Sequence, residues 1–531
     1  MILDARSVQS PLLECDLCIV GAGAAGISLA LAFAGTAVAV VLLEGGGLEF
    51  EEASQAFYEG ENRSAVHFPI ETQRLRYLGG TTNHWGGTTL RLQAHDPAAR
   101  PDVPGSGWPI TLADLEAHFP AAEALCQLGT DRGSPDDWQR ACGQTPLRLE
   151  RGALTTGIIR WSPPTRFGEV YRDRLAAASN IRVLLHANAT GLMAAPDASR
   201  VNRVEVACLD GPRFRVRARR FVLAQGALET PRLLLLSNQQ QAAGLGNGHG
   251  MVGRCYMDHP GVTGSALQLA PGAPAFDFFY DQVVVGDARV TGVFAPRPET
   301  LVAEGIGNFK LSLGKLGPMP QGIEAARTLM ESAAARVAPP DLGRNLAHVL
   351  MDLDQVSNVI YKSLIDRRGF LPNRTAGPPD GRLAGIHVSA EQLPNPDSRV
   401  TLSDRTDALG QRKLVLDWRL QERDYRTLRR GVALFASAIA ANGLGRVRSF
   451  RELGAPAFPR LIQTACHAAG TARMADDPKQ GVVDRNLRVH GISNLFVAGG
   501  AVFPSVGAAN PTLTIVALAL RLAEHLKQDA A

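Results

Sequence analysis

Three glycines near the start of the chain have the spacing of a site that holds a dinucleotide. They form the pattern Gly21-x-Gly23-x-x-Gly26 and follow the apolar segment CDLCIV. The first glycine permits a tight turn, the second lets the backbone approach a pyrophosphate, and the third lets a helix pack on the strand. Free N–H groups and the positive dipole end of that helix attract phosphate. We therefore expect a pyrophosphate at this turn, with Ala24 and Ala25 among its contacts.

Glu44 is placed to bind a ribose. It ends the apolar segment TAVAVVLLE and stands 18 residues after Gly26. A carboxylate at the end of the second strand of such a unit can accept hydrogen bonds from a ribose diol. The same carboxylate would repel a phosphate on that ribose, which disfavours NADP and leaves NAD or FAD.

Further glycine-rich segments distinguish between these two cofactors. Residues 79–87 read GGTTNHWGG, residues 498–500 read AGG, and the apolar segment FVLAQG ends at Gly226. A flavin buried in a protein needs close backbone approach in several places, so these segments favour FAD. Two alternatives stay open from the residues alone: an NAD-dependent dehydrogenase with the same first fingerprint, and a flavin-binding protein without catalytic activity.

Seven segments that follow one another along the chain resemble the glucose–methanol–choline (GMC) oxidoreductases. They are VGAGAAG at 20–26, GGTTNHWGG at 79–87, AQGALETPRLL at 224–234, VGRCYMDHPG at 252–261, EQLPNPDSRVTLS at 391–403, HAAGTARM at 467–474 and GAANPTLTIVALALR at 507–521. The form of GGTTNHWGG resembles the pyranose oxidases and bacterial glucoside 3-dehydrogenases within that family. The resemblance implies an FAD-dependent oxidase or dehydrogenase that oxidises an alcohol.

The resemblance also implies that His467 and Asn510 are the catalytic residues. In the family, the histidine of the pattern H-x-x-G-T stands over the flavin, beside a His or Asn from the last segment. A neutral imidazole can accept the hydroxyl proton while hydride leaves the carbon for flavin N5. An Asn amide can hold the substrate oxygen without competing for that proton. From the residues alone, His467 could equally be a satisfied buried histidine, and Asn510 the N-cap of a helix starting at Pro511.

Other contacts follow from the same resemblance. His84 aligns with the histidine that covalently holds the flavin in some pyranose oxidases, whereas other relatives bind FAD without that bond, and both options stay open. His259 would face the substrate or order a loop, and Gln392 and Asn395 would line the substrate site. The residues expected to contact the cofactor are Gly21, Gly23, Ala24, Ala25, Gly26, Glu44, Gly79, Gly80, Thr82, Asn83, His84, Ala189, Gly226, Gly500, Ala501, Asn510, Pro511 and Thr512.

We expect neither a metal site nor disulfide bonds. Cys15 and Cys18 form a C-x-x-C, but residues three apart on a strand point to opposite faces, and no second C-x-x-C follows. The seven cysteines are odd in number and scattered along the chain, which is typical of reduced thiols.

An α/β fold with two domains must position these residues. Alternating apolar strands and helices at 15–44 and 180–236 predict a Rossmann-type FAD-binding domain with a parallel sheet. A substrate-binding domain would have a mainly antiparallel sheet, including 386–418, backed by helices. We expect the FAD-binding domain to comprise 1–100, 180–262 and 465–531, and the substrate-binding domain 101–179 and 263–464. The helical stretch 318–366 could be a lid or a subunit contact.

Composition limits the partners and the location. The 531 residues carry a formal net charge of +4 without a basic block, which gives no electrostatic footprint for nucleic acid. The longest apolar run, residues 27–43, contains Gly35 and Thr36, so a helix, a turn and a strand explain it better than a membrane span. No secretory signal precedes the first glycine motif, so we expect a cytoplasmic protein, while export with a partner subunit stays open.

The substrate is expected to be a small-molecule alcohol. The subfamily resemblance implies a secondary hydroxyl of a sugar or glycoside. A benzylic or allylic alcohol, such as a lignin-derived phenylpropanoid, is the alternative. The electron acceptor stays open between oxygen, a quinone and a partner subunit.

Overall fold

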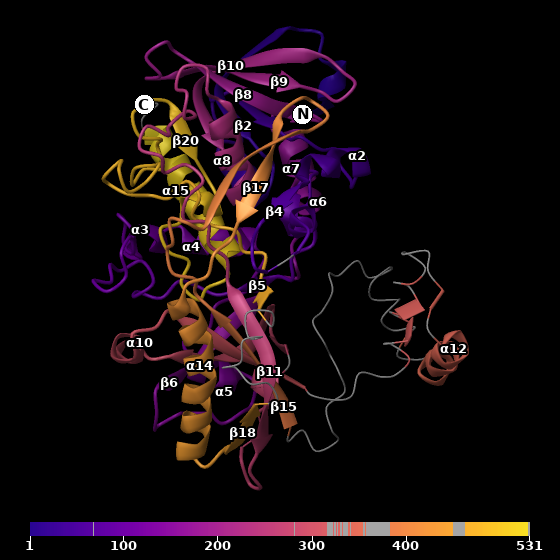
Figure 1. The fold of residues 1–531 in the computed structure, drawn as a ribbon, viewed down its shortest axis with the longest axis vertical. Coiled ribbons are helices and arrows are strands. Elements are labelled where there is room, and N and C mark those ends of the chain that lie inside the picture. Colours follow the sequence, from indigo (N-terminus) through magenta and orange to yellow (C-terminus); the bar gives the residue numbers. More distant parts are fainter. Residues whose placement is uncertain are drawn as a thin grey trace.

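Two large sheets organise the chain, one above the other in the view of Figure 1. Each sheet is the centre of its own cluster of buried apolar side chains. The computed structural model describes residues 1–66, 68–274, 276–280, 282–315, 338–339, 341–353, 383–449 and 462–528, together with residue 356 and a few single positions within 322–332. An α/β fold with both parallel and antiparallel pairing confirms the predicted fold class.

The first sheet is mainly parallel. Its strands are β1 (Ile2–Asp4), β2 (Leu12–Val20), β3 (Val40–Leu43), β7 (Ile181–Leu185), β8 (Asn188–Ala194), β9 (Val201–Ala207), β10 (Arg213–Leu223) and β20 (Leu495–Val497). Their order is β1-β7-β3-β2-β10-β9-β8, and β20 pairs with the last residues of β10. β3 is buried throughout, as expected for a strand covered on both faces. β10 alternates exposed and buried residues beside β9, and its last three residues, beside β2 and β20, are all buried.

Three helices pack around this sheet and begin where the glycine-rich segments end. They are α1 (Ala24–Ala32), α8 (Gly226–Leu236) and α15 (Pro511–Gln528). α1 packs against α15, and α8 packs against β8. The predicted strand–turn–helix–strand unit is therefore present as β2, α1 and β3, and the predicted helices at the other two positions are also confirmed.

The second sheet is antiparallel. Its strands are β5 (Thr88–Thr89), β6 (Leu154–Trp161), β11 (Pro260–Leu269), β12 (Val283–Val285), β13 (Ala288–Pro296), β14 (Phe309–Lys315), β15 (Leu383–Ala390), β18 (Gly445–Ser449) and β19 (Gln463–Thr464). The long helix α14 (Glu422–Ala441) packs against β11, β14 and β15. It begins where the backbone N–H of Gln421 donates to the Asp424 carboxylate at 2.7 Å, which satisfies a donor at the helix start.

A third, small sheet corrects one expectation. β16 (Arg399–Thr406) and β17 (Arg412–Asp417) form the predicted strand pair, but β17 pairs with β4 (Gly60–Asn62) and not with the large antiparallel sheet. Of the segment 386–418, only the part in β15 belongs to that large sheet. The parallel pairing with β4 needs a strand from far earlier in the chain, which local sequence pattern does not reveal.

The remaining elements are short. The α-helices are α2 (Glu52–Gln55), α3 (Ala113–Glu116), α4 (Phe119–Leu125), α5 (Pro135–Ala141), α6 (Phe167–Val170), α7 (Arg172–Ala177), α9 (Asp277–Tyr280), α10 (Pro298–Glu304) and α12 (Leu342–Met351). The 3-10 turns lie at Ala5–Ser7, Ala56–Tyr58, Ile70–Gln73, Gly80–Asn83 and Gly500–Val502. Within the stretch 318–366, α12 is described and stands away from both sheets (Figure 1), whereas most of the rest lies outside the described residues.

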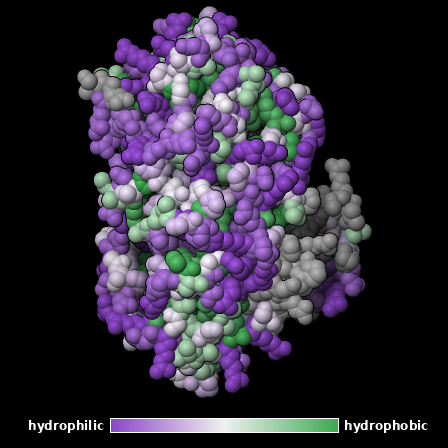
Figure 2. Space-filling view, turned by 60° about the vertical axis from the view of Figure 1, so that its left-hand side comes forward, coloured by the Kyte–Doolittle hydropathy of each residue, from purple (hydrophilic) through white to green (hydrophobic). Residues whose placement is uncertain are grey.

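The apolar run at residues 27–43 is divided between α1 and β3, as its glycine and threonine predict. In the described part of the chain, no helix combines the length and the apolar character needed to cross a membrane. The face drawn in Figure 2 carries mostly hydrophilic side chains, interrupted by smaller apolar clusters.

Candidate active site

A cavity of about 620 Å³ lies at the carboxyl ends of the parallel strands β2, β3 and β10. The first residues of α1, α8 and α15 also line it, and residues 72–76, 80–82, 187–190 and 465–468 add to the wall. Ligands bind at this edge of open α/β sheets. The volume lies within the range of roughly 300–1,000 Å³ typical of small-molecule and cofactor sites.

The first glycine turn is shaped to receive a pyrophosphate. Gly21 has φ +102°, and a Cβ on it would lie 2.7 Å from the Ala224 carbonyl oxygen. A Cβ on Gly26 would lie 1.9 Å from the Gly21 carbonyl oxygen, so α1 can pack here only with glycine. A Cβ on Gly23 would meet nothing within 4 Å, because that side opens to the cavity. No side chain caps α1, so N–H groups of its first turn stay available to an anion.

Glu44 lies buried at the end of β3, in the cavity wall. Its Oε2 accepts from the Ala22 N–H at 3.0 Å, and its Oε1 accepts from the Gly46 N–H at 2.9 Å. Each carboxylate oxygen has a second lone pair, so the group can still accept hydrogen bonds from a ribose diol. The residues present therefore fit the adenosine and pyrophosphate of FAD.

The second glycine segment forms an ordered turn against the same cavity. Thr82 Oγ1 donates to the Gly79 carbonyl oxygen at 2.7 Å, and Asn83 Nδ2 donates to the Leu78 carbonyl oxygen at 2.9 Å. His84 follows in the cavity wall, where partial desolvation of its ring lowers its pKa and the charge of Arg166 lowers it further.

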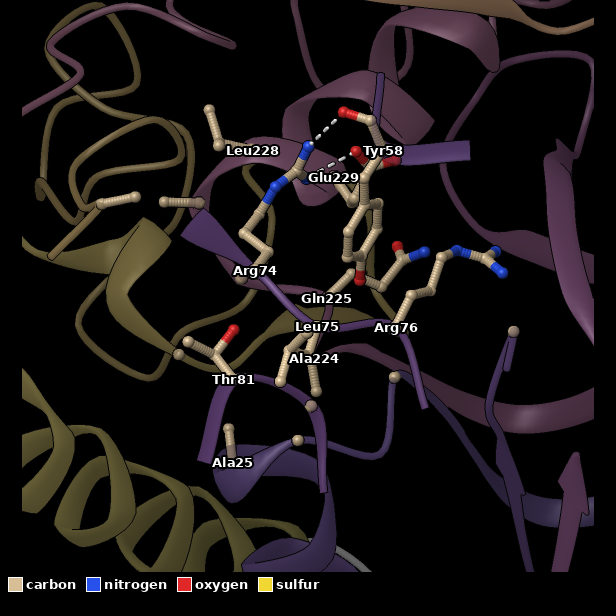
Figure 3. A pocket seen from close by; sticks show the side chains of 18 of the residues that line it. Ala25, Tyr58, Arg74, Leu75, Arg76, Thr81, Ala224, Gln225, Leu228 and Glu229 are labelled. Carbon is tan, nitrogen blue, oxygen red and sulfur yellow. Dashed lines mark hydrogen bonds and ion pairs between the residues drawn. The ribbon is translucent and has the colours of Figure 1, made fainter. Parts of the chain in front are cut away.

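A cationic and aromatic part of the wall was not predicted from the sequence. The Arg74 guanidinium lies 4.0 Å from the centre of the Tyr58 ring and pairs with Glu229 at 2.7 Å (Figure 3). Arg76 lies over the Phe57 ring at 4.8 Å. Glu229 comes from α8, whereas the two arginines and the two aromatic residues come from the segment of short elements between β3 and the second glycine turn, where no periodic pattern marks them.

Two histidines stand together beside the cavity. His467, in the wall, and His259, fully buried, have their Nδ1 atoms 2.9 Å apart, with the rings nearly perpendicular. His259 Nε2 lies 2.9 Å from the Gly507 carbonyl oxygen. Asn510 Nδ2 lies 3.5 Å from His467 Nε2. The structure therefore brings together the two predicted catalytic residues and His259.

These contacts determine which nitrogens carry protons. The Gly507 carbonyl can only accept, so His259 Nε2 carries a hydrogen. Burial and the nearby Lys310 charge lower the pKa of His259 to about 4, so its ring is neutral and its Nδ1 is an acceptor. His467 Nδ1 must then be the donor. In a neutral His467 ring, this leaves Nε2, the nitrogen next to Asn510, as the free lone pair.

Asp258 ties the two histidine backbones together. Its Oδ1 accepts from the backbone N–H groups of His259 at 2.7 Å and of His467 at 2.9 Å, and its Oδ2 accepts from Thr464 Oγ1. Burial raises the pKa of Asp258 to about 6, against the opposing effect of these hydrogen bonds. This carboxylate was not predicted as a site residue, although it lies in the segment MDHPG.

Burial places the pKa of His467 well below 6.5, and interaction with the neighbouring His259 and with Lys310 lowers it further. A base must be unprotonated before it can accept a proton, so these surroundings keep His467 ready at neutral pH. Lys310, on β14, was also not predicted; its Nζ donates to the Asn510 Oδ1 at 2.8 Å.

The cavity wall contains most of the residues predicted to contact cofactor or substrate. They are Gly21, Gly23, Ala24, Ala25, Glu44, Gly80, Thr82, His84, Ala189, Gly226, His467, Gly500, Asn510, Pro511 and Thr512. Gly26, Gly79, Asn83, His259 and Ala501 stand outside it. Gly26 and Asn83 hold the two turns, and His259 supports His467.

Gln392 and Asn395 require a correction, because neither lines the cavity among the described residues. Gln392 is fully buried, and its Oε1 accepts from the Asp258 N–H at 3.0 Å and from Trp418 Nε1 at 2.6 Å. Asn395 donates to the Arg419 carbonyl oxygen at 3.2 Å. Both amides are used in packing the loop after β15, and Gln392 reaches the site only through Asp258.

The cluster of Asp258, His259 and His467 places one possible metal-ligand atom of each residue within 4.8 Å of the others. The two Nδ1 atoms hydrogen-bond to each other, and both Asp258 oxygens already accept hydrogen bonds. We therefore interpret the cluster as a hydrogen-bonded network that orients His467.

Comparison with known proteins agrees with this site. Two family models described as GMC oxidoreductase match residues 169–261 and 394–519. Paromamine 6'-oxidase from Streptomyces fradiae is 28% identical over 498 residues, which cover 85% of this chain and 78% of that protein. The fructose dehydrogenase large subunit from Gluconobacter japonicus is 24% identical, over 90% of this chain and 85% of that protein.

A solved structure shares the fold. Pyridoxine 4-oxidase from Mesorbium loti has a TM-score of 0.57 and 19% identity, over 97% of this chain and 99% of that one. The family matches and the shared fold agree with the cofactor cavity described above. The chain binds FAD, oxidises the CH–OH group of an alcohol and belongs to the GMC oxidoreductases.

Proposed function

We propose that this enzyme oxidises a hydroxyl group of a sugar or a glycoside, with His467 as the base and Asn510 as its partner. The observation that carries the proposal is the free Nε2 of His467 beside the Asn510 amide in the cavity wall. Two relatives support the substrate class, since their names state that they act on paromamine, at its 6' position, and on fructose. That the hydroxyl is a secondary one stays a prediction, to be decided by the oxidised product.

Each residue of the site has a separate proposed role in the reaction. FAD, when bound, supplies the acceptor for the hydride that leaves the alcohol carbon. Asn510 Nδ2 donates a hydrogen bond to the hydroxyl oxygen and holds it beside His467. His467 Nε2 accepts the hydroxyl proton as the C–H bond breaks, and general-base help of this kind contributes roughly 10²–10⁴-fold. The new charge on His467 is then stabilised because its Nδ1–H donates to His259.

The cavity residues would hold FAD in three places. The turn at Gly21 and Gly23 and the start of α1 would hold the pyrophosphate, Glu44 and Ala189 the adenosine, and the turn at 80–84 with residues 500–512 the flavin. We further propose that no covalent bond joins His84 to the flavin. Acid precipitation should then release the flavin to the supernatant, whereas flavin retained in the protein pellet would contradict this.

We also propose the division into an FAD-binding domain (1–100, 180–262 and 465–531) and a substrate-binding domain (101–179 and 263–464). Most of the cavity wall falls in the first set, which supports the division. Asp407, Leu409 and Gln411 of the second set line the cavity too, so both parts would contribute to the site.

Anaerobic mixing of the purified enzyme with single alcohols tests the function. The panel is D-glucose, methyl β-D-glucopyranoside, D-fructose, benzyl alcohol and cinnamyl alcohol, and a sample without alcohol is the control. We expect the visible flavin absorbance to be lost with a sugar or glycoside. Loss of the flavin absorbance with benzyl or cinnamyl alcohol alone would show that the substrate is an aryl alcohol and not a sugar. No loss of absorbance with any alcohol of the panel would contradict the proposed function. Oxygen and a quinone can then be compared as acceptors.

A further inference from the structure

Lys310 is a buried lysine beneath the catalytic residues. It lies on β14, where Phe309, Leu311 and Leu313 alternate with it and enter the core of the antiparallel sheet. The Lys310 side chain lies between them in sequence and takes the opposite face, yet it is only 7% exposed. The segment before α15 is in contact with that face, since Lys310 Nζ donates to the Ala508 carbonyl oxygen at 2.7 Å and to the Asn510 Oδ1 at 2.8 Å.

This contact determines how the Asn510 amide is turned. A side-chain amide has one accepting oxygen and one donating NH₂ group, and a lysine ammonium can only donate. The oxygen must therefore face Lys310, which leaves Nδ2 on the side of His467 Nε2, 3.5 Å away. The reverse orientation would set two donors against each other at Lys310 and place the amide oxygen against the His467 lone pair.

A buried polar network that includes the charge of Asp96 lies near Lys310. Burial lowers the pKa of Lys310 to about 7, although the nearby charge of Asp96 acts in the opposite direction. Asp96 accepts from Asn308 Nδ2 at 2.7 Å, and the Asn308 backbone N–H donates to Glu391 at 2.9 Å. Gly507 closes the arrangement, because a Cβ on it would lie 2.5 Å from the Asp96 carboxylate carbon.

We propose that Lys310 is a positioning residue for the alcohol oxidation: it holds the Asn510 amide so that its NH₂ group faces the substrate oxygen. The proposal rests on the proposed function, since it acts through Asn510 in that reaction. The antiparallel sheet would then contribute to the reaction, because Lys310 lies on β14 and orients Asn510, which directly precedes α15.

A double-mutant cycle tests this proposal. The variants are Lys310→Met, which keeps an unbranched side chain of nearly the same length and removes its donors, Asn510→Ala, and the two combined. The rate of flavin reduction at saturating alcohol and the dissociation constant of the alcohol are measured by anaerobic rapid mixing. The probe is the member of the alcohol panel named above that reduces the wild-type flavin fastest. Lys413→Met is the matched control, because Lys413 is a strand lysine paired with Glu59 at 2.7 Å.

We expect Lys310→Met to lower the limiting rate by about 10- to 100-fold with little change in the dissociation constant, since it misplaces a group without removing it. In the Asn510→Ala background the same substitution should cost less than about 3-fold, because the group that it orients is already absent. Equal losses in both backgrounds would show a general structural role and overturn the proposal, as would a Lys310→Met rate equal to that of Lys413→Met.

If Lys310→Met does not fold or does not hold FAD, the Asn510→Asp variant tests the proposed orientation of the Asn510 amide. Aspartate keeps an acceptor for Lys310 but has no NH₂ group for the substrate. A loss of rate as large as that of Asn510→Ala would support the proposal, and a rate near wild type would overturn it. If no alcohol of the panel reduces the wild-type flavin, the proposed function itself fails, and this proposal fails with it.

Discussion

The His467 ring has two nitrogens, and only one of them is free to react. Its Nδ1 is committed to His259, which is in turn fixed by the Gly507 carbonyl. A protonated His467 would still donate through Nδ1, so the pair suits a base that gains and later loses a proton. The arrangement predicts that replacing His467 and replacing Asn510, the two proposed catalytic residues, lower the rate of flavin reduction by different amounts.

We predict that His467→Ala lowers the rate of flavin reduction by roughly 10²–10⁴-fold, the usual contribution of a general base. Asn510→Ala should cost less, about 10- to 100-fold, because it removes the group that orients the substrate and leaves the base. Both variants should retain FAD, whose binding is checked by the visible spectrum. Anaerobic rapid mixing measures the rates, and a His467→Ala enzyme reduced at nearly the normal rate would exclude His467 as the base and make His259 the next candidate.

The pH dependence of the reaction should reflect the low pKa of His467. Burial and the neighbouring His259 and Lys310 disfavour the imidazolium form of His467, so the neutral base persists as the pH falls through 6.5, the ordinary value. Flavin reduction at saturating alcohol should therefore not fall as the pH is lowered from about 8 to about 6.5, a range in which Lys310, with a pKa of about 7, gains its charge, and it should decline only below that. A half-loss of rate at or above pH 6.5 would contradict this prediction. The buried Asp258, with a pKa near 6, is a second group that can contribute to the decline.

Some site residues could be predicted from the sequence and others could not. His467 and Asn510 lie in distinctive segments, so the sequence alone singled out these two residues of the cavity wall. Lys310 was missed because a single lysine in an alternating strand normally points to solvent, and only the covering segment before α15 buries it. Gln392 was assigned wrongly because a polar residue in a family segment can serve packing as well as binding.

Three helices of the parallel-sheet half direct their first turns at the cavity. α1, α8 and α15 each follow a glycine-rich or small-residue segment, and the first residues of each lie in the wall. These elements were predicted well, because uninterrupted apolar strands and glycine turns are strong local signals. The pairing of β17 with β4 was not, because it depends on contact between distant segments.

The start of α1 offers a direct test of cofactor binding. We predict that Gly23→Val gives a folded protein with at least about tenfold weaker FAD binding, since the added side chain would occupy the cavity. Gly23 has φ −83°, which valine adopts freely, so the fold should survive. Gly191→Val is the matched control, because a Cβ there also meets nothing within 4 Å and the residue lies outside the wall. Flavin content after purification and circular dichroism are the measurements, and equal flavin content in both variants would contradict the assignment.

At the scale of the whole molecule, the cofactor cavity joins segments that are far apart in the chain. Its wall includes residues near both ends of the chain and residues of the turn between β16 and β17. A ligand that contacts all of these parts should stabilise the entire fold against unfolding.

We predict that FAD raises the melting temperature of the apoprotein and that the increase grows with the logarithm of FAD concentration. At a concentration 100 times the dissociation constant, the stabilisation is about 2.7 kcal/mol. FMN is the control, because it lacks the adenosine that Glu44 and Ala189 would hold. Differential scanning fluorimetry with each cofactor measures the effect, and an equal increase with FMN would contradict the placement of the adenosine.

The separation of Gly23 and Asn510 along the chain also has a consequence for biosynthesis. A ribosome adds roughly 5–20 residues per second, so the two walls of the cavity are made roughly half a minute to a minute and a half apart. The strand–turn–helix unit of β2, α1 and β3 leaves the ribosome early and must persist without its cofactor. FAD can be enclosed only after the segment that carries Asn510 has emerged, so flavin capture is one of the last events in the maturation of this enzyme.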